Sequence, residues 1–284
     1  MQSHKDGKWA KQILSMRQAD GLWGNFHTLS RPVAGKGYTT EQAIRRLYYL
    51  GYTAEDAVIQ PVLRRMEQCI RGGLPIDGYS EKKHDWPFFE TLMLSAWLRV
   101  FAPQNEAALE VAYQWASLAE KAFARGCYDR EADLAAFTAW KGRKPKSTLE
   151  TGFGMFYHAA LLPGVLSPNT EGQFLDYYLS KPDGMFYIYD KPLCQPPEVF
   201  ASRASSCYIA AMEVLSRYAQ AKGKLQFVVD WLQENRDENG QWDFGPAARD
   251  GIYFPLSDRW DTATRVLDST ERVNRLLAAL GGGD

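Results

Sequence analysis

A glycine-containing turn recurs along the chain at a nearly constant interval, and this recurrence limits the folds that the chain can adopt. Each glycine follows a plausible helix, and the intervals between them are 52, 53, 58 and 56 residues: Gly21, Gly73, Gly126, Gly184 and Gly240. Four of the five are followed two residues later by an aromatic side chain: Trp23, Tyr128, Phe186 and Trp242. An interval of about 55 residues holds two ordinary helices and their connections. We therefore expect a repeated helical hairpin.

The remaining pattern predicts an almost all-helical domain. Strand patterns are nearly absent, and apolar residues recur at helical spacing over 9–19, 40–50, 57–71, 87–101, 105–124, 148–162, 171–180, 198–220, 223–236 and 266–280. Long loops are expected at 24–38, 74–85, 127–147, 186–197 and 243–266, all at one end of the hairpins. Capping-box spacings predict helix starts at Thr39–Gln42, Ser147–Glu150 and Asp268–Glu271. Residues 1–280 are expected to form one domain, followed by a flexible tail at 281–284.

Two of the expected helices are apolar nearly all round, which predicts that they are buried on more than one face. Their sequences are TLMLSAWLRVF and FGMFYHAALL, and each follows one of the long loops. We expect them to form an inner layer, with the other helix of each hairpin outside. The hairpins could stack as an open solenoid or close into a ring.

Charge and composition exclude several classes of partner. Lysine and arginine number 33 against 34 aspartates and glutamates, so the broad basic field of a nucleic-acid or anionic-membrane binder is not expected. No apolar segment has the length of a signal peptide or a membrane span, and we expect a cytoplasmic protein. The four cysteines form no CxxC pair and are expected to be reduced, buried thiols. The oligomeric state is left open.

The turn at Gly240-Gln241-Trp242 resembles the QW motif of the terpenoid cyclase and protein prenyltransferase superfamily. The segments DGLWG at 20–24 and DGMF at 183–186 are similar to degenerate copies of it. The resemblance implies an α/α toroid of about five to six helical hairpins, with inner and outer helix layers around an aromatic central cavity. It also implies binding or transformation of an isoprenoid-type apolar substrate, by isomerase, lyase or transferase chemistry. The turn tryptophan is expected to staple neighbouring repeats together.

The segment DRWDTA at 258–263 is similar to the acid motif with which cyclases of this superfamily protonate an alkene. Asp258 and Asp261 are therefore candidate catalytic acids, with Trp260 and Asp268 as candidate ligand contacts. Trp260 stands where the motif places its proton donor, so conventional protonation-initiated cyclisation is not expected. The alternative is that Asp261, or Asp268, caps the final helix.

A second group of candidates precedes the inner helix that begins near residue 87. His84 and Asp85 are candidate catalytic residues, and Trp86 and Glu90 are candidate ligand contacts. The neighbouring lysines and the first N–H groups of the helix could hold an anion. The alternative is a solvated basic loop in which Asp85 caps the helix.

His158 and Arg203 are the remaining candidate ligand contacts. His158 lies on the apolar face of GMFYHAALL, where it either points into the cavity or is a hydrogen-bonded core histidine. Arg203 lies among small residues and could bind an acidic ligand, or pair with Glu90, Glu150 or Glu271.

No metal ion and no other cofactor is expected. Cys127-Tyr128 and Cys207-Tyr208 look like the cysteine part of the zinc site of protein prenyltransferases, but Arg125 and Ser205 replace its carboxylate. A zinc site that uses Cys127 and His158 is the weaker alternative.

Two other functions fit the same helical pattern. A carbohydrate-active α/α barrel would use Asp85, Glu90, Asp258 and Asp261 as acid and base across an open cleft. A non-catalytic toroid would bind another protein at its end, and a cavity filled by side chains would support that function.

Overall fold

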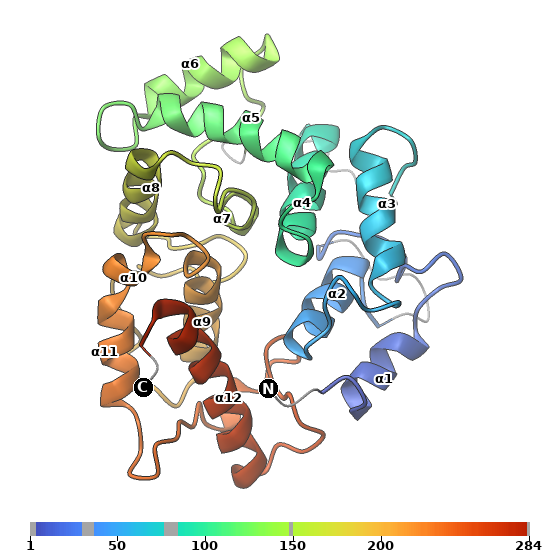
Figure 1. Cartoon of the computed structure of the whole chain (residues 1–284), viewed down its shortest axis with the longest axis vertical. Coiled ribbons are helices and arrows are strands. Elements are labelled where there is room, and N and C mark those ends of the chain that lie inside the picture. The colour runs from blue at the N-terminus through green and yellow to red at the C-terminus, as the bar shows by residue number, and fades with distance from the viewer. Residues whose placement is uncertain (1–3, 30–36, 77–84, 148–149, 283–284) are drawn as a thin grey trace.

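A computed structural model of the chain describes residues 4–29, 37–76, 85–147 and 150–282, and it is all-helical over these residues, as predicted (Figure 1). The only extended pairings within them are two isolated bridges, Met155 with Phe186 and Met185 with Tyr189. The helices are α1 (Lys8–Ser15), α2 (Thr40–Tyr49), α3 (Gln60–Ile70), α4 (Trp86–Phe101), α5 (Glu106–Ala122), α6 (Arg130–Lys141), α7 (Phe156–Leu161), α8 (Pro168–Ser180), α9 (Arg203–Leu215), α10 (Ala221–Lys224), α11 (Gln226–Glu234), the 3-10 helix η2 (Pro246–Ala248) and α12 (Thr262–Leu280).

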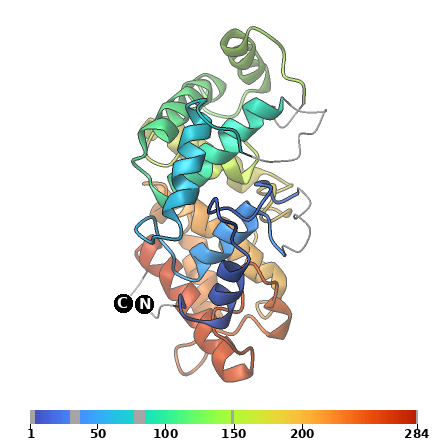
Figure 2. The same ribbon diagram turned by 90° about the vertical axis from the view of Figure 1, so that its right-hand side faces the viewer.

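The helices alternate between an outer and an inner position along the chain. Helices α1, α3, α5, α8 and α11 lie outside, and each precedes an inner helix, α2, α4, α7, α9 or α12 (Figures 1 and 2). Inner neighbours contact one another in the order α4, α7, α9, α12. Helix α2 meets α9, because the Tyr49 hydroxyl donates to the Glu213 carboxylate at 2.9 Å. This packing is consistent with the predicted toroid of about five to six hairpins.

The inner helices are buried on several faces because they are apolar on several faces. All six residues of α7 are buried, and so are ten residues of α4, from Phe89 to Phe101. By contrast, only two residues of α1 and two of α3 are buried. The prediction of an inner layer from the apolar runs TLMLSAWLRVF and FGMFYHAALL is confirmed.

The first and last of the five turns use tryptophan as a staple in the same way. Trp23 and Trp242 are fully buried, and each indole N–H donates to a carbonyl of the preceding outer helix, at 2.7 Å to Ile13 and 2.6 Å to Leu232. Each backbone N–H donates to a threonine hydroxyl of the following inner helix, at 3.0 Å for Trp23 and 3.1 Å for Trp242. One residue therefore ties the outer helix of a hairpin to its inner helix, and not one repeat to the next as expected.

The glycines of both turns are required by the backbone. Gly21 has φ +87° and Gly240 has φ +78°, a left-handed conformation that costs other residues conformational energy. The turn at 72–73 has its left-handed residue one position earlier than predicted, at Gly72 with φ +75°. The turn at Gly184 also departs from the pattern, because Phe186 remains 48% exposed and does not staple two helices.

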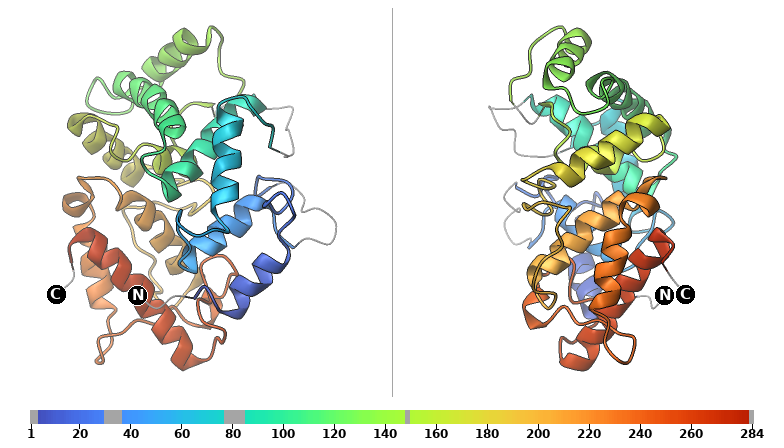
Figure 3. Two further views of the ribbon diagram at one scale, coloured as in Figure 1. Left: turned by 45° about the vertical axis from the view of Figure 1, so that its right-hand side comes forward. Right: turned by 90° about the vertical axis from the view of Figure 1, so that its left-hand side faces the viewer.

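Several predicted helix boundaries are confirmed and others are wrong. Thr39 forms a complete capping box with Gln42 at the start of α2, as predicted. Helix α6 lies in a segment predicted to be a loop, because Asp129 caps it by accepting from the N–H groups of Glu131 and Ala132, and it packs across α5 at one end of the molecule (Figures 1 and 3).

The two other predicted capping boxes do not start helices. Helix α7 begins only at Phe156, well after Glu150. Helix α12 begins at Thr262, so Asp268 lies in its interior rather than at its start. The N-cap of α12 is Asp261, whose carboxylate accepts from the Thr264 N–H at 3.0 Å. Capping by Asp261 is therefore confirmed, and capping by Asp268 is wrong.

The four cysteines are free, but the prediction that they are buried is wrong. Cys127 and Cys194 are exposed, whereas Cys69 and Cys207 are half-buried. The exposed pair lies in connections outside the helices, where apolar periodicity carries no information about burial. No helix of the described residues is long and apolar enough to cross a membrane.

We expect Trp242→Phe and Trp23→Phe each to reduce the free energy of unfolding by about 1–3 kcal/mol, because each leaves a buried carbonyl without its donor. Trp260→Phe is the matched control. It removes the same indole N–H, but from a half-buried ring whose acceptor is the Pro246 carbonyl, and we expect a loss of under about 1 kcal/mol. Urea unfolding measures all three variants. A Trp242→Phe protein as stable as Trp260→Phe would show that the staple does not hold the hairpin.

Candidate functional site

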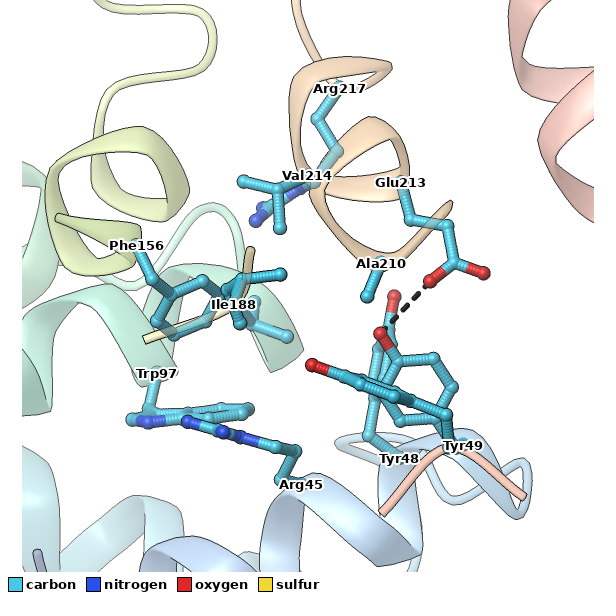
Figure 4. A pocket seen from close by; sticks show the side chains of 12 residues that line it. Arg45, Tyr48, Tyr49, Trp97, Phe156, Ile188, Ala210, Glu213, Val214 and Arg217 are labelled. Atoms are coloured by element: carbon cyan, nitrogen blue, oxygen red, sulfur yellow. Dashed lines mark hydrogen bonds between the residues drawn. The ribbon is translucent and has the colours of Figure 1, made fainter. Parts of the chain in front are cut away.

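A small cavity lies between the inner helices, toward the C-terminal ends of α2, α4 and α9 (Figure 4). Its volume is about 40 Å³, and its lining combines aromatic, aliphatic and charged side chains: Arg45, Tyr48, Tyr49, Trp97, Val100, Phe156, Ile188, Ala210, Glu213, Val214, Arg217 and Tyr253. A cavity of this size holds one or two water molecules, whereas pockets for organic ligands measure roughly 300–1,000 Å³. The side chains therefore nearly fill the centre of the molecule.

A fully buried carboxylate stands beside this cavity, at the start of α2. Glu41 accepts from the Trp97 indole at 2.9 Å, from the Tyr157 hydroxyl at 2.7 Å, and from the backbone and hydroxyl of Thr28 at 2.7 and 2.6 Å. Arg45 adds a longer contact at 3.3 Å. Burial alone would raise the pKa of Glu41, but the charge of Arg45 and these donors hold it below its ordinary value. Glu41 is an ionised carboxylate with all its acceptor positions in use.

Arg45 reaches the cavity with most of its donors unused. Its guanidinium lies alongside the Trp97 ring, 5.5 Å from the centroids of both Trp97 and Phe156 (Figure 4). The side chain is only 9% exposed, and its Nε has no hydrogen-bond partner among the residues that the structure describes. An arginine carries five N–H donors, so this one is under-satisfied for a buried cation.

A second buried ion pair closes the opposite side of the cavity. The Arg272 guanidinium is 0% exposed and donates to both carboxylate oxygens of Glu213, at 2.8 and 3.0 Å. Arg272 also donates to Ser206 at 2.9 Å, and it lies over the Tyr49 and Tyr253 rings at 5.1 and 4.7 Å. Glu213 is thus committed to Arg272 and to the Tyr49 hydroxyl. Its carboxylate oxygens are therefore already in use and contribute little to the binding of a ligand.

A short aromatic loop separates the cavity from a groove on the surface. This aromatic loop, residues 184–191, contributes Ile188 to the lining of both the cavity and the groove. The groove has a volume of about 550 Å³, and its other walls include Phe186, Tyr187 and the side chains of Arg203 and Cys207. Tyr187 has φ +77°, a strained conformation for a non-glycine residue that is frequent in loops that contact ligands.

The candidates of the C-terminal segment make structural contacts and do not line the cavity. Asp258 accepts from the Lys8 N–H at 2.6 Å and so caps α1. Asp261 caps α12, and the Trp260 indole donates to the Pro246 carbonyl at 3.1 Å. Asp268 is buried and accepts from the N–H groups of Leu256 and Ser257 at 2.7 and 2.9 Å, although burial still raises its pKa.

The candidates at the start of α4 also lie away from the cavity, and His84 falls outside the described residues. Asp85 stands at the N-cap position of α4 without making a side-chain cap, and it pairs instead with Arg143 at 2.5 Å. Burial raises the pKa of Asp85, but Arg143, Lys146 and the Phe88 N–H together hold it below its ordinary value. Trp86 packs edge-on against His27, with centroids 5.9 Å apart. The Cys69 thiol lies 3.9 Å from Glu90, whose pKa is raised by burial.

His158 neither lines the cavity nor forms the predicted core hydrogen bond. It is fully buried against Trp115 and Phe153, with centroids 4.6 and 5.5 Å away, and both ring nitrogens lack partners among the described residues. Burial lowers the pKa of His158 to about 3, so the ring is neutral at pH 7.

Arg203 is exposed and lines the surface groove, so it does not pair with any of the three carboxylates proposed for it. Glu150 pairs with Arg143 at 2.9 Å, Glu271 accepts from His4 and Arg275, and Glu90 faces Cys69. Cys127 and His158 are not joined in a zinc site. Within the described ranges, no group of three or more histidine, cysteine, aspartate or glutamate side chains is placed to hold a metal ion.

The sequence candidates and the cavity-lining residues are therefore different sets. The cavity depends on Arg45, Glu41 and Glu213, which lie in helices that the sequence predicts correctly. One signal for them was available, because Glu41 and Arg45 stand one helical turn apart in a helix that could be expected to lie inside. No protein-family model, curated protein or solved structure is detectably similar to this chain.

We expect acid to destabilise the wild-type protein more than the His158→Leu variant. The pKa of His158 falls from 6.5 in the unfolded chain to about 3 in the fold, so the stability present above pH 6.5 is lost as the pH falls. Between pH 7 and pH 5 the extra loss is about 2 kcal/mol. Urea unfolding at both pH values measures it, and equal losses for the two proteins would contradict a buried neutral imidazole.

Proposed function

We propose that this chain binds a small, largely apolar molecule between its inner helices, and that the aromatic loop covers the bound ligand. The observation that carries the proposal is the position of Ile188, which is a wall of both the central cavity and the open groove. A shift of this one side chain would join the two spaces. The apolar part of the joined site would include Trp97, Val100 and Phe156.

The volumes decide how such a ligand would have to enter. The cavity of about 40 Å³ is too small for an isoprenoid chain, whereas the groove of about 550 Å³ has the size of an ordinary ligand pocket. The aromatic loop is closed largely on itself, since the Met185 N–H donates to Tyr189 at 2.8 Å and the Ile188 N–H donates to Met185 at 3.1 Å. Its link to the start of α7 is a pair of backbone bonds at Phe186, of 3.0 and 3.1 Å. Side chains of the loop also pack on the inner helices, with ring centroids 5.4 Å apart for Tyr187 and Tyr157 and for Tyr189 and Tyr208. Entry of a ligand would therefore need a shift of Ile188 rather than release of the whole loop.

Binding is better supported than protonation-initiated cyclisation. Alkene protonation needs a carboxylic acid that faces the substrate. Among the described residues, Glu213 is the only carboxylate in the cavity lining, and it is held by Arg272. Neighbouring Glu41 is ionised and fully hydrogen-bonded. The likeness to the terpenoid cyclase superfamily, carried by the turns at Trp23 and Trp242, therefore supports the ligand class more than the chemistry.

The carbohydrate alternative has one observation in its favour and one against it. Asp85 faces a groove of about 320 Å³ between α4, α5 and α6 that Trp140 and Phe88 also line. Lys141 occupies the face of Trp140 at 3.7 Å, so the ring is not a free platform for a sugar. Glu90 does not line this groove. The two carboxylates near the start of α4 therefore do not share one cleft.

The proposal predicts that neutral isoprenoid alcohols raise the melting temperature of the protein. Isopentenol, geraniol and farnesol are suitable probes, and binding at 100 times the dissociation constant adds about 2.7 kcal/mol of stability. We expect Ile188→Trp, which fills the space between cavity and groove, to abolish the shift.

Val199→Trp is the matched control, because Val199 is 64% exposed and lines neither space. It should keep the full shift. Probes that leave the melting temperature of every protein unchanged would refute ligand binding and favour the protein-binding scaffold.

A further inference from the structure

Glu41 has a full set of hydrogen-bond partners, whereas its ion-pair partner Arg45 has few. Glu41 accepts four hydrogen bonds shorter than 3.0 Å from groups other than Arg45. Arg45 makes one hydrogen bond within the described residues, at 3.3 Å to Glu41. Glu41 would therefore remain bound by neutral donors without its arginine. The remaining N–H donors of Arg45 could therefore bind an acceptor group of a ligand.

The charges around the cavity are also unbalanced. Arg45 and Arg272 stand against Glu41 and Glu213, but Arg217 adds a third guanidinium that also reaches the cavity. Arg217 donates to the carbonyls of Ala160 and Arg99, at 3.3 and 2.7 Å, and has no carboxylate partner in the part of the chain that the structure describes. Buried charges in proteins are ordinarily paired. Arg217 therefore adds positive charge at the cavity that no carboxylate among the described residues neutralises, and an anionic ligand would interact favourably with it.

We propose that the ligand of the central cavity carries a carboxylate group, which accepts two hydrogen bonds from the guanidinium of Arg45 through N–H groups that Glu41 does not use. This inference rests on the proposed function and names the chemical class of the ligand. A carboxylate is planar and matches the guanidinium fork in two parallel bonds. Its size suits a cavity of about 40 Å³, and Trp97 supports the guanidinium from one side (Figure 4).

The apolar body of the ligand would extend from this carboxylate past Phe156 and beneath Ile188 toward the groove. Phe156 and Ile188 both line the cavity, and Phe186 and Tyr187 continue the apolar surface outside it. The ligand class is thus a small organic acid with a branched or aromatic body. A phosphate ester is a poorer match, because a tetrahedral group with three outer oxygens needs more donors than one planar fork supplies.

Isothermal titration of the whole chain with matched probes tests this inference. Isovalerate, isovaleramide and isoamyl alcohol share one branched body and differ in the polar group, and inorganic phosphate tests the anion alone. We expect isovalerate to bind about 10–100 times more tightly than the amide or the alcohol, which corresponds to charge-assisted hydrogen bonds. On the unmodified protein, the Nε–H resonance of Arg45 should shift on addition of isovalerate and not of the alcohol.

The variant that tests the contact removes both members of the ion pair, since removal of Arg45 alone would leave Glu41 without its counter-charge. Glu41→Gln with Arg45→Met should lower the affinity for isovalerate at least about tenfold more than it lowers the affinity for isoamyl alcohol. Arg125→Met is the matched control, because the Arg125 side chain is 81% exposed. It should change neither affinity.

Three results would overturn the inference, and they separate it from the proposed function. Equal affinities for isovalerate, its amide and the alcohol would leave the cavity as a ligand site and remove the carboxylate. Tighter binding of inorganic phosphate than of isovalerate would assign the anion to another class. Absence of binding by all the probes, together with no thermal shift by the isoprenoid alcohols, would remove the ligand site itself.

Discussion

The inner helices end inside the protein, and their last carbonyl groups must find donors there. Arginine side chains supply these donors. Arg99 donates to the Leu161 carbonyl at 3.1 Å, and Arg217 donates to the carbonyls of Ala160 and Arg99, at the ends of α7 and α4. Arg46 serves the connection before α12 by donating to the Ile252 carbonyl at 3.2 Å. A cation at a helix C-terminus also interacts favourably with the helix dipole. The arginines therefore stabilise the buried helix ends both by hydrogen bonds to carbonyl groups and by charge.

This arrangement explains why the centre of the molecule is charged as well as aromatic. The arginines that close helix ends bring positive charge into the core, and burial lowers the pKa of Arg99 and of Arg217. Glu41 and Glu213 pair with Arg45 and Arg272, so Arg99 and Arg217 have no carboxylate partner among the described residues. The central cavity thus has an apolar wall of Trp97 and Phe156 beside a cationic one, which distinguishes it from the purely aromatic cavity that the resemblance implied.

Local signals in the sequence predicted the helices and turns well, since those depend on residues close together in the chain. The staples at Trp23 and Trp242 follow from a glycine and an aromatic residue two positions apart. The start of α2 follows from the Thr39–Gln42 capping box. Helix α6 was predicted to be a loop, because two helices and their connections already filled the interval of about 55 residues. Asp268 was misplaced because its capping spacing occurs inside a helix, where its real partners are the N–H groups of a distant connection, at Leu256 and Ser257.

The sequence by itself determined the all-helical class, the hairpin period and which helices lie inside, because apolar periodicity and turn chemistry are local properties. The candidate site was decided only by the tertiary structure. Glu41, Trp97 and Tyr157 come from three helices. The packing of these helices gives the Glu41 carboxylate a full set of hydrogen bonds and leaves Arg45 with unused donors. Hydrogen-bond satisfaction is a property of the whole fold, since the donors and acceptors that meet in a core are distant in the chain.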